Sequence, residues 1–417
     1  MSQLKYIPSI IEQYVDEVPF LYSFRKNASI APDYVLDELA ELDERLEANI
    51  CGLLMMGDVA WDMCEEALAL DREGDVFTLT LLAIELNDLK RLQWIIVQLD
   101  SDEKTLFDSV VDAFGYFPFQ KIAQLLKDMY TLPMPIMQTL VIASLLFHRQ
   151  VPEKLIQHNL ISKNFLTKKE VIFSVGIMGM QKYLNMVTPL LDDENEDIAF
   201  AACWTETRFG NQTALAKLER FITHPQYGDL SLQYVVMQND IHKVTGILRK
   251  MFADKSTKRL SIMGLGYVGK ANSIPSLITM MDAPETARVS GEAFSLLTGI
   301  NLTANNLSRE DPVKLDAEPL DSADDDNVEM DPDQDLPWPD AEKIKQWWSQ
   351  NQQNYYADKR YIGGRELSIG SLKQMLKQAN QRQRLFASNI LALYDRNHPL
   401  FNTQAPAKRQ KVLLGNL

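Results

Sequence analysis

The stretch that decides the fold is Lys258–Asp282, KRLSIMGLGYVGKANSIPSLITMMD. An apolar segment with helical spacing ends at Gly269, and a second apolar segment, IPSLITMM, follows and ends at Asp282. Glycine tolerates the left-handed backbone that commonly ends a helix, so Gly269 marks a turn between two helices. The stretch therefore predicts a pair of short antiparallel helices.

The same order of segments recurs at Val171–Asp193 and Asp197–Ile222. The predicted turns between paired helices lie 28 to 33 residues apart, near Gly57, Asn87, Gly115, His148, Gly179, Gly210, Asn239 and Gly269. This spacing leaves room for two helices of three turns with short connections. Neither helix can bury its apolar stripe alone, whereas stacked pairs share one core. The sequence predicts an all-α fold, a HEAT-like α-solenoid of stacked antiparallel helix pairs; a four-helix bundle with long inserts is the alternative.

Charge divides the 417 residues into regions of different character. The formal net charge is −15, which disfavours nonspecific binding to nucleic acid or anionic membranes. We expect an N-terminal helical cap over 1–30, the repeats over 31–300, an acidic proline-containing connector over 301–340 and a basic helical module over 341–417. The acidic and basic regions are expected to associate within the molecule. Little positive electrostatic potential would then remain to attract DNA.

Membrane insertion and catalysis find little support in the sequence. The longest apolar stretch, 132–147, is too short to span a bilayer. Cys51, Cys64 and Cys203 are isolated, which favours buried thiols in a reducing cytoplasm. The five histidines are scattered without metal-ligand spacing, and no GxSxG motif occurs. We therefore expect a protein that is not an enzyme.

A glycine motif at 264–269 resembles a phosphate-binding loop, because Gly264, Gly266 and Gly269 spell GxGxxG. The segment before it has helical rather than strand spacing, and Ala271 stands where a magnesium-binding hydroxyl would be needed. We therefore interpret these glycines as packing residues at a repeat turn.

Four acidic residues have the ligand spacing of an EF-hand calcium loop: Asp331, Asp333, Asp335 and Glu342. Leu336 replaces the glycine that such a loop needs, and Pro337 and Pro339 stiffen the backbone. Calcium is therefore a weak candidate cofactor, and a solvated or docked acidic connector is the preferred interpretation.

Aromatic and basic residues of the C-terminal region are candidates for contact with a partner. Trp338, Trp347 and Trp348 lie close together, either as the core of a small module or as an interaction hot spot. Asp340 is expected to cap a helix that runs to about Asn354. The basic residues near the end of the chain include Arg409, which we retain as a partner-binding candidate.

Several segments resemble a bacterial family of HEAT-repeat proteins encoded in type VI secretion loci beside VgrG spikes, PAAR tips and effectors. They are AELDERLEAN (40–49), ARVSGEAFSLLTGINL (287–302), VEMDPDQDLPWPD (328–340), RYIGG (360–364), QRQRLFASNILALY (381–394) and PLFNTQAPAKRQKVLL (399–414). The resemblance implies a cytoplasmic accessory protein and supplies no catalytic residues. An aromatic residue commonly precedes the arginine of the last motif, whereas this chain has Lys408.

Three functions follow as hypotheses. The first is an adaptor or chaperone whose concave face grips an effector or a VgrG/PAAR protein. The second is an immunity protein that blocks a toxin. The third is a HEAT-fold enzyme acting on DNA or a small molecule, which the acidic charge and the scattered histidines disfavour.

Overall fold

A computed structural model describes residues 7–99, 104–310 and 331–415. The described residues are mostly helical, which confirms the predicted all-α class. The β-strands of the described residues form two short antiparallel pairs, β1 (Ser308–Arg309) with β2 (Trp338–Pro339) and β3 (Tyr361–Ile362) with β4 (Arg365–Glu366). No described helix is both long enough and apolar enough to cross a membrane.

The chain divides into two compact units. Unit 1 contains 1–30, 34–214 and 395–417, and unit 2 contains 31–33 and 215–394. The C-terminal region is therefore shared between the units, whereas the sequence placed its boundaries at 30, 300 and 340. Contacts between residues distant in sequence decide these limits, and charge patterning does not report them.

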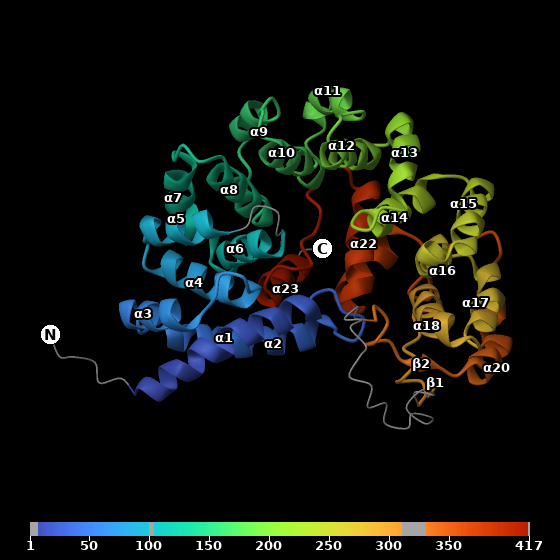
Figure 1. Ribbon diagram of the computed structural model, residues 1–417. Helices are drawn as coiled ribbons and strands as arrows, with labels where there is room; N and C mark the ends of the chain where they lie inside the picture. Colours follow the sequence, from blue (N-terminus) through green and yellow to red (C-terminus); the bar gives the residue numbers. More distant parts are fainter. Residues whose placement is uncertain (1–6, 100–103, 311–330, 416–417) are drawn as a thin grey trace. The chain divides into compact units, whose positions relative to one another are not determined.

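Unit 1 is organised around a row of helices in which each packs on the next (Figure 1). This first-helix row contains α4 (Glu73–Glu85), α6 (Lys104–Tyr116), α8 (Pro135–Phe147), α10 (Phe165–Ile177) and α12 (Glu196–Arg208). The second helices are α3 (Asp58–Ala67), α5 (Leu89–Gln98), α7 (Phe119–Tyr130), α9 (Glu153–Asn159), η1 (Gln181–Tyr183), α11 (Leu184–Val187) and η2 (Thr188–Leu190). Further elements are α1 (Pro8–Ala28), which packs on α2 (Leu36–Leu54) and α4, and α23 (Ala407–Gly415), which packs on α2.

Burial explains the two layers of unit 1. In α4 every residue from Gly74 to Ile84 is buried, as expected of a helix covered on all sides. By contrast, α7 buries only Ile122, Leu125, Leu126 and Met129, an apolar stripe with the spacing of one helix face. The first-helix row is thus the core of unit 1, and amphipathic second helices cover it.

Unit 2 repeats this arrangement. Its first helices α14 (Gly228–Gln238), α16 (Lys255–Val268) and α18 (Pro284–Thr298) pack in sequence. The other helical elements of unit 2 are η3 (Glu219–Phe221), α15 (Ile241–Ala253), η4 (Ala271–Ser273), α17 (Ile274–Met280), α20 (Ala341–Asn351), η5 (Gln352–Asn354), α21 (Ile369–Gln378) and α22 (Gln381–Tyr394). Helix α13 (Gln212–Leu218) contains the boundary between the units.

The turns largely follow the sequence prediction. Positive φ angles occur at Gly57, Asn87, Gly179, Gly210 and Gly269. Turns also lie near the remaining three predicted positions, where α6, α8 and α14 end. The predicted residues there do not themselves have positive φ: Arg149 has it beside His148, Asn239 has φ −92°, and Gly115 lies in the last turn of α6. Gly115 serves packing, because a Cβ there would lie 2.4 Å from the ring of Phe147.

The cysteines also correct one expectation. Cys64 and Cys203 are buried, but Cys51 is exposed. A single residue of a surface helix carries no sequence signal that separates the two cases.

Candidate functional site

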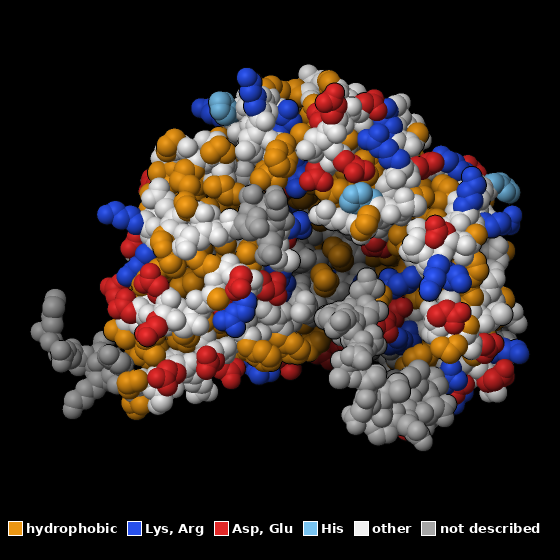
Figure 2. Space-filling view, in the orientation of Figure 1, with side chains coloured by type: hydrophobic (Ala, Val, Ile, Leu, Met, Phe, Trp, Pro, Cys, Tyr) orange, Lys and Arg blue, Asp and Glu red, His pale blue; other side chains and the backbone are white. Residues whose placement is uncertain are grey.

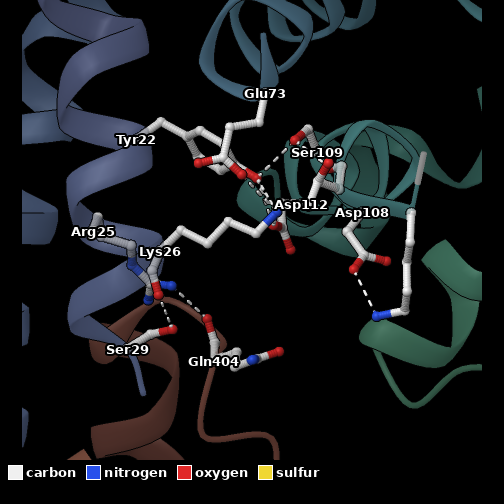
Figure 3. A network of polar contacts seen from close by, with 11 residues as sticks. Tyr22, Arg25, Lys26, Ser29, Glu73, Asp108, Ser109, Asp112 and Gln404 are labelled. Carbon is white, nitrogen blue, oxygen red and sulfur yellow. Dashed lines mark hydrogen bonds and ion pairs between the residues drawn. The ribbon is translucent and has the colours of Figure 1, made fainter. Parts of the chain in front are cut away.

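A network of polar side chains joins α1 to α4 and α6 (Figure 3). The Tyr22 hydroxyl donates to Asp112 Oδ2 over 2.7 Å, with Ser109 Oγ 3.2 Å away. Lys26 Nζ donates to Tyr22 Oη over 3.1 Å and lies 3.6 Å from Asp112 and 3.5 Å from Glu73. The ammonium group of Lys26 therefore contacts the phenol of Tyr22 and two carboxylates, and these three groups come from three helices.

Burial sets the protonation of this network. It raises the pKa of Tyr22, and the charge of Asp112 raises it further. Burial also raises the pKa of Asp112, against the effect of Lys26. Tyr22 is 3% exposed, and its ring stacks on Phe77 with centroids 3.9 Å apart. A protonated phenol held in this way ties helices together, and a substrate cannot reach it.

The N-terminal turns of the first-helix row carry charged side chains, named here the charged ladder: Lys104, Asp108, Lys169, Glu170 and Asp197. Lys104 pairs with Asp108 over 3.0 Å, and Lys169 pairs with Asp197 over 3.2 Å. The side chains of Lys104 and Asp108 are 64% and 38% exposed. The ladder extends over α6, α10 and α12 of unit 1.

Unit 2 contains a cluster of arginines and carboxylates. Arg259 of α16 pairs with Asp333 over 2.6 Å, and Arg382 of α22 pairs with Glu292 of α18 over 2.9 Å. Glu292 is only 5% exposed, and burial raises its pKa although Arg382 and Arg259 act against this. The cluster fastens α22 and the 331–335 loop to the first helices of the unit.

The acidic residues proposed for calcium lie in and near this cluster. Asp333 contacts Arg259, Asp331 pairs with Arg288, and Asp335 is exposed. Glu342 lies on α20 with its carboxylate 3.8 Å from Lys345. Among the described residues, no group of three or more His, Cys, Asp and Glu is placed to hold a metal ion. Residues 311–330, half of the acidic connector, lie outside the described part of the chain, and the predicted association of this segment with the basic region falls outside it as well.

The predicted aromatic residues pack within unit 2. The guanidinium of Arg288 lies 4.8 Å from the ring centre of Trp338. Trp347 meets Phe294 edge-on at 5.6 Å, and Trp348 lies 5.3 Å from the ring of Tyr355. Trp338 is buried, whereas Trp347 and Trp348 are half-buried. Asp340 accepts a hydrogen bond from the backbone of Lys343, and so caps α20 as predicted.

The glycine motif is a packing feature. Gly264 and Gly266 lie inside α16, where a Cβ would approach Leu248 and Ala293 at 2.4 and 3.0 Å. Gly269 ends that helix in the left-handed conformation. The segment before the motif is therefore helical, as predicted, and the glycines form no loop around a phosphate.

An apolar pocket of about 410 Å³ lies among α15, α16 and α17. Its lining includes Ile241, Leu248, Phe252, Leu265 and Met280, with Arg249 and Lys270 as the charged members. Sequence reasoning missed it, because a pocket between neighbouring helix pairs depends on how closely they stack.

Arg409, the remaining candidate, lies against the end of α6. Its Nη2 donates to the carbonyl oxygens of Gly115 and Phe117 over 3.0 and 3.3 Å. The sequence also missed Tyr22 and Asp112 as partners, since nothing local relates residues so far apart along the chain.

No family model matches the chain, and none of the curated proteins compared with it is similar enough to count as a relative.

Proposed function

We propose that the chain is a HEAT-like α-solenoid that serves as a non-catalytic protein-binding scaffold. The observation that supports this most is the first-helix row of unit 1, in which α4, α6, α8, α10 and α12 pack in chain order. Such stacking produces an extended surface rather than a closed active site. Within the charged ladder, Lys104 and Asp108 add exposed charge to unit 1.

The side chains best suited to chemistry are engaged in packing. Tyr22 is buried against Phe77, and Glu292 lies between two arginines. Groups with raised pKa values often mark active sites, but ion-pair networks inside a fold produce the same shifts. Because these groups lie between helices of one unit, they support a structural role.

The narrower proposal follows the resemblance of the quoted motifs. We propose an adaptor or chaperone of a type VI secretion system that holds an effector or a VgrG/PAAR protein in the bacterial cytoplasm. The charged ladder would steer such a partner, because complementary charge raises association rates and discriminates among partners.

The test is recovery of partners from the native bacterium with the tagged full-length protein. A VgrG, PAAR or effector protein in the eluate supports the adaptor. Recovery of a toxin from the adjacent gene establishes the immunity alternative. Recovery of DNA or small molecules alone contradicts a protein-binding scaffold.

A matched pair of variants locates the contact. Lys104→Glu reverses an exposed charge of the ladder, and Lys345→Glu reverses an exposed charge on α20. We expect Lys104→Glu to reduce recovery of the partner several-fold and Lys345→Glu to leave it unchanged. Equal recovery with both variants would remove the ladder from the binding surface.

A further inference from the structure

The C-terminal segment of unit 1 runs across the ends of the first-helix row. Residues 396–411, named here the strap, meet the helix ends in reverse chain order. Arg396 donates to the carbonyl of Phe209 after α12 over 2.9 Å, and the Leu400 N–H donates to Ile177 of α10 over 2.8 Å. Further along, Asn402 donates to Phe147 of α8 over 3.2 Å.

Arg409 continues the series at the end of α6, where it donates to Gly115 and Phe117. Each contact uses a carbonyl at or just beyond a helix C-terminus. The last four carbonyl groups of a helix lack partners inside it, and that end carries partial negative charge. The strap's hydrogen-bond donors satisfy these carbonyl groups. Two of the donors are guanidinium groups, whose positive charge also complements the partial negative charge.

The row also donates to the strap. Arg149 Nε donates to the Leu400 carbonyl over 2.9 Å, and Arg208 Nη2 donates to the His398 carbonyl over 2.5 Å. The backbone of the strap thus both donates a hydrogen bond to a helix end and accepts hydrogen bonds from arginines near such ends. These backbone contacts fall on His398 and Leu400, where the strap has no helix or strand, whereas Arg409 lies on α23. Contacts to the backbone of an irregular segment are typical of peptide recognition.

Two turn glycines allow the strap to approach. A Cβ on Gly179 would lie 2.7 Å from the carbonyl carbon of Asn397. A Cβ on Gly210 would lie 2.6 Å from the guanidinium of Arg396. Both glycines have positive φ, so they form the turns and also leave room for the strap.

We propose that the helix ends of unit 1 form a peptide-binding surface, with the strap as its resident and separable ligand. The ligand class is a peptide with an irregular segment that carries an amide side chain for the end of α8, followed by a short helix, α23, that carries an arginine for the end of α6. This inference concerns the chain's own segment and stands apart from the proposed function, so a failed recovery of partners leaves it intact.

The test cuts the link to the strap while keeping both pieces. A specific protease sequence is inserted between Tyr394 and Asp395, which lie in an exposed stretch, and the full-length protein is then cleaved. A labelled synthetic peptide of residues 395–417 is added, and fluorescence anisotropy follows its binding. We expect cleaved protein to exchange its fragment for the peptide. Uncleaved protein should not bind it, because a tethered segment competes at an effective concentration of about millimolar.

Two peptide variants make the readout specific. Arg409→Ala removes the donors at the end of α6 and should weaken binding at least about tenfold, since each lost bond is worth about 1 kcal/mol. Lys408→Ala changes an exposed neighbour and should leave binding unchanged. Equal weakening by both peptides contradicts recognition at the helix end.

Two outcomes of the cleavage overturn the proposal. The first is a helical cleaved protein, judged by circular dichroism, that loses its fragment and binds no peptide. The second is unfolding on cleavage, which would make the strap an inseparable part of the core.

Discussion

The backbone N–H of Leu400 donates to the carbonyl oxygen of Ile177 over 2.8 Å, and the same Leu400 accepts from Arg149 through its own carbonyl. One residue of the strap is therefore held by two neighbouring helix pairs of unit 1. The basic character of the C-terminal region has a structural use here, because guanidinium groups lie at the negative ends of helices.

Gly179→Ala tests the approach of the strap. The new methyl group would meet the backbone of Asn397, and alanine is strained at φ 71°. We expect unit 1 to lose about 1–3 kcal/mol of stability in urea unfolding. The control is Gly246→Ala on α15, where a Cβ meets nothing within 4 Å. That change should be neutral or add about 0.5–1 kcal/mol, because alanine favours a helix.

Tyr22→Phe tests the network of α1, α4 and α6. The change removes the hydroxyl that donates to Asp112 and leaves that carboxylate with one partner fewer. We expect a loss of about 1–3 kcal/mol in the free energy of unfolding. Tyr356→Phe, at a ring that is 66% exposed, should change stability by less than about 0.5 kcal/mol. Similar losses from both substitutions would show that the network contributes nothing of its own.

His148 makes the stability of unit 1 depend on pH. Burial, aided by the charge of Arg409, lowers its pKa from 6.5 to about 4. The folded state therefore binds this proton less readily than the unfolded chain does. The stability that His148 contributes is complete above pH 6.5 and is lost as the pH falls toward 4.

The His148 contribution to the slope is at most about 1.4 kcal/mol per pH unit within that window. Unfolding measured at pH 7 and pH 5 should show His148→Gln losing less stability than the wild type. His158→Gln, an exposed residue of α9, serves as the control and should follow the wild type. If the unfolding free energy of the His148 variant changed with pH as steeply as that of the wild type, the pH dependence would belong to other groups.

Asp333→Asn tests the arginine cluster of unit 2. Asp333 is 8% exposed and accepts from Arg259, so its loss leaves a partly buried guanidinium without its nearest carboxylate. We expect a loss of about 1–3 kcal/mol, against less than about 0.5 kcal/mol for the exposed Asp335→Asn. Calcium should not raise the melting temperature, because the carboxylates of Asp331 and Asp333 are already paired with arginines. A rise that Asp331→Ala abolishes would establish the calcium loop instead.

The sequence predicted what depends on local chemistry. The helical class, the turns at Gly179, Gly210 and Gly269 and the cap at Asp340 all follow from backbone preferences or helix periodicity. The turn near His148 is also present, although the residue with positive φ there is Arg149, which carries no turn signal.

Contacts between distant residues could not be predicted in the same way. Arg409 and Gly115 meet because the chain returns to unit 1 after completing unit 2. Nothing in a basic motif distinguishes a helix end from an external partner. Tyr22 and Asp112 likewise have ordinary neighbours in sequence and acquire their pKa shifts only from the packing between helices.

Hydrogen exchange of the intact protein tests the docking of the strap most directly. Leu400 lies outside regular secondary structure, yet its amide bonds to Ile177. We expect exchange there at least about 100-fold slower than in a free peptide of the same sequence. Exchange at the rate of the free peptide, with α10 still protected, would show that the C-terminal segment does not lie on the helix ends.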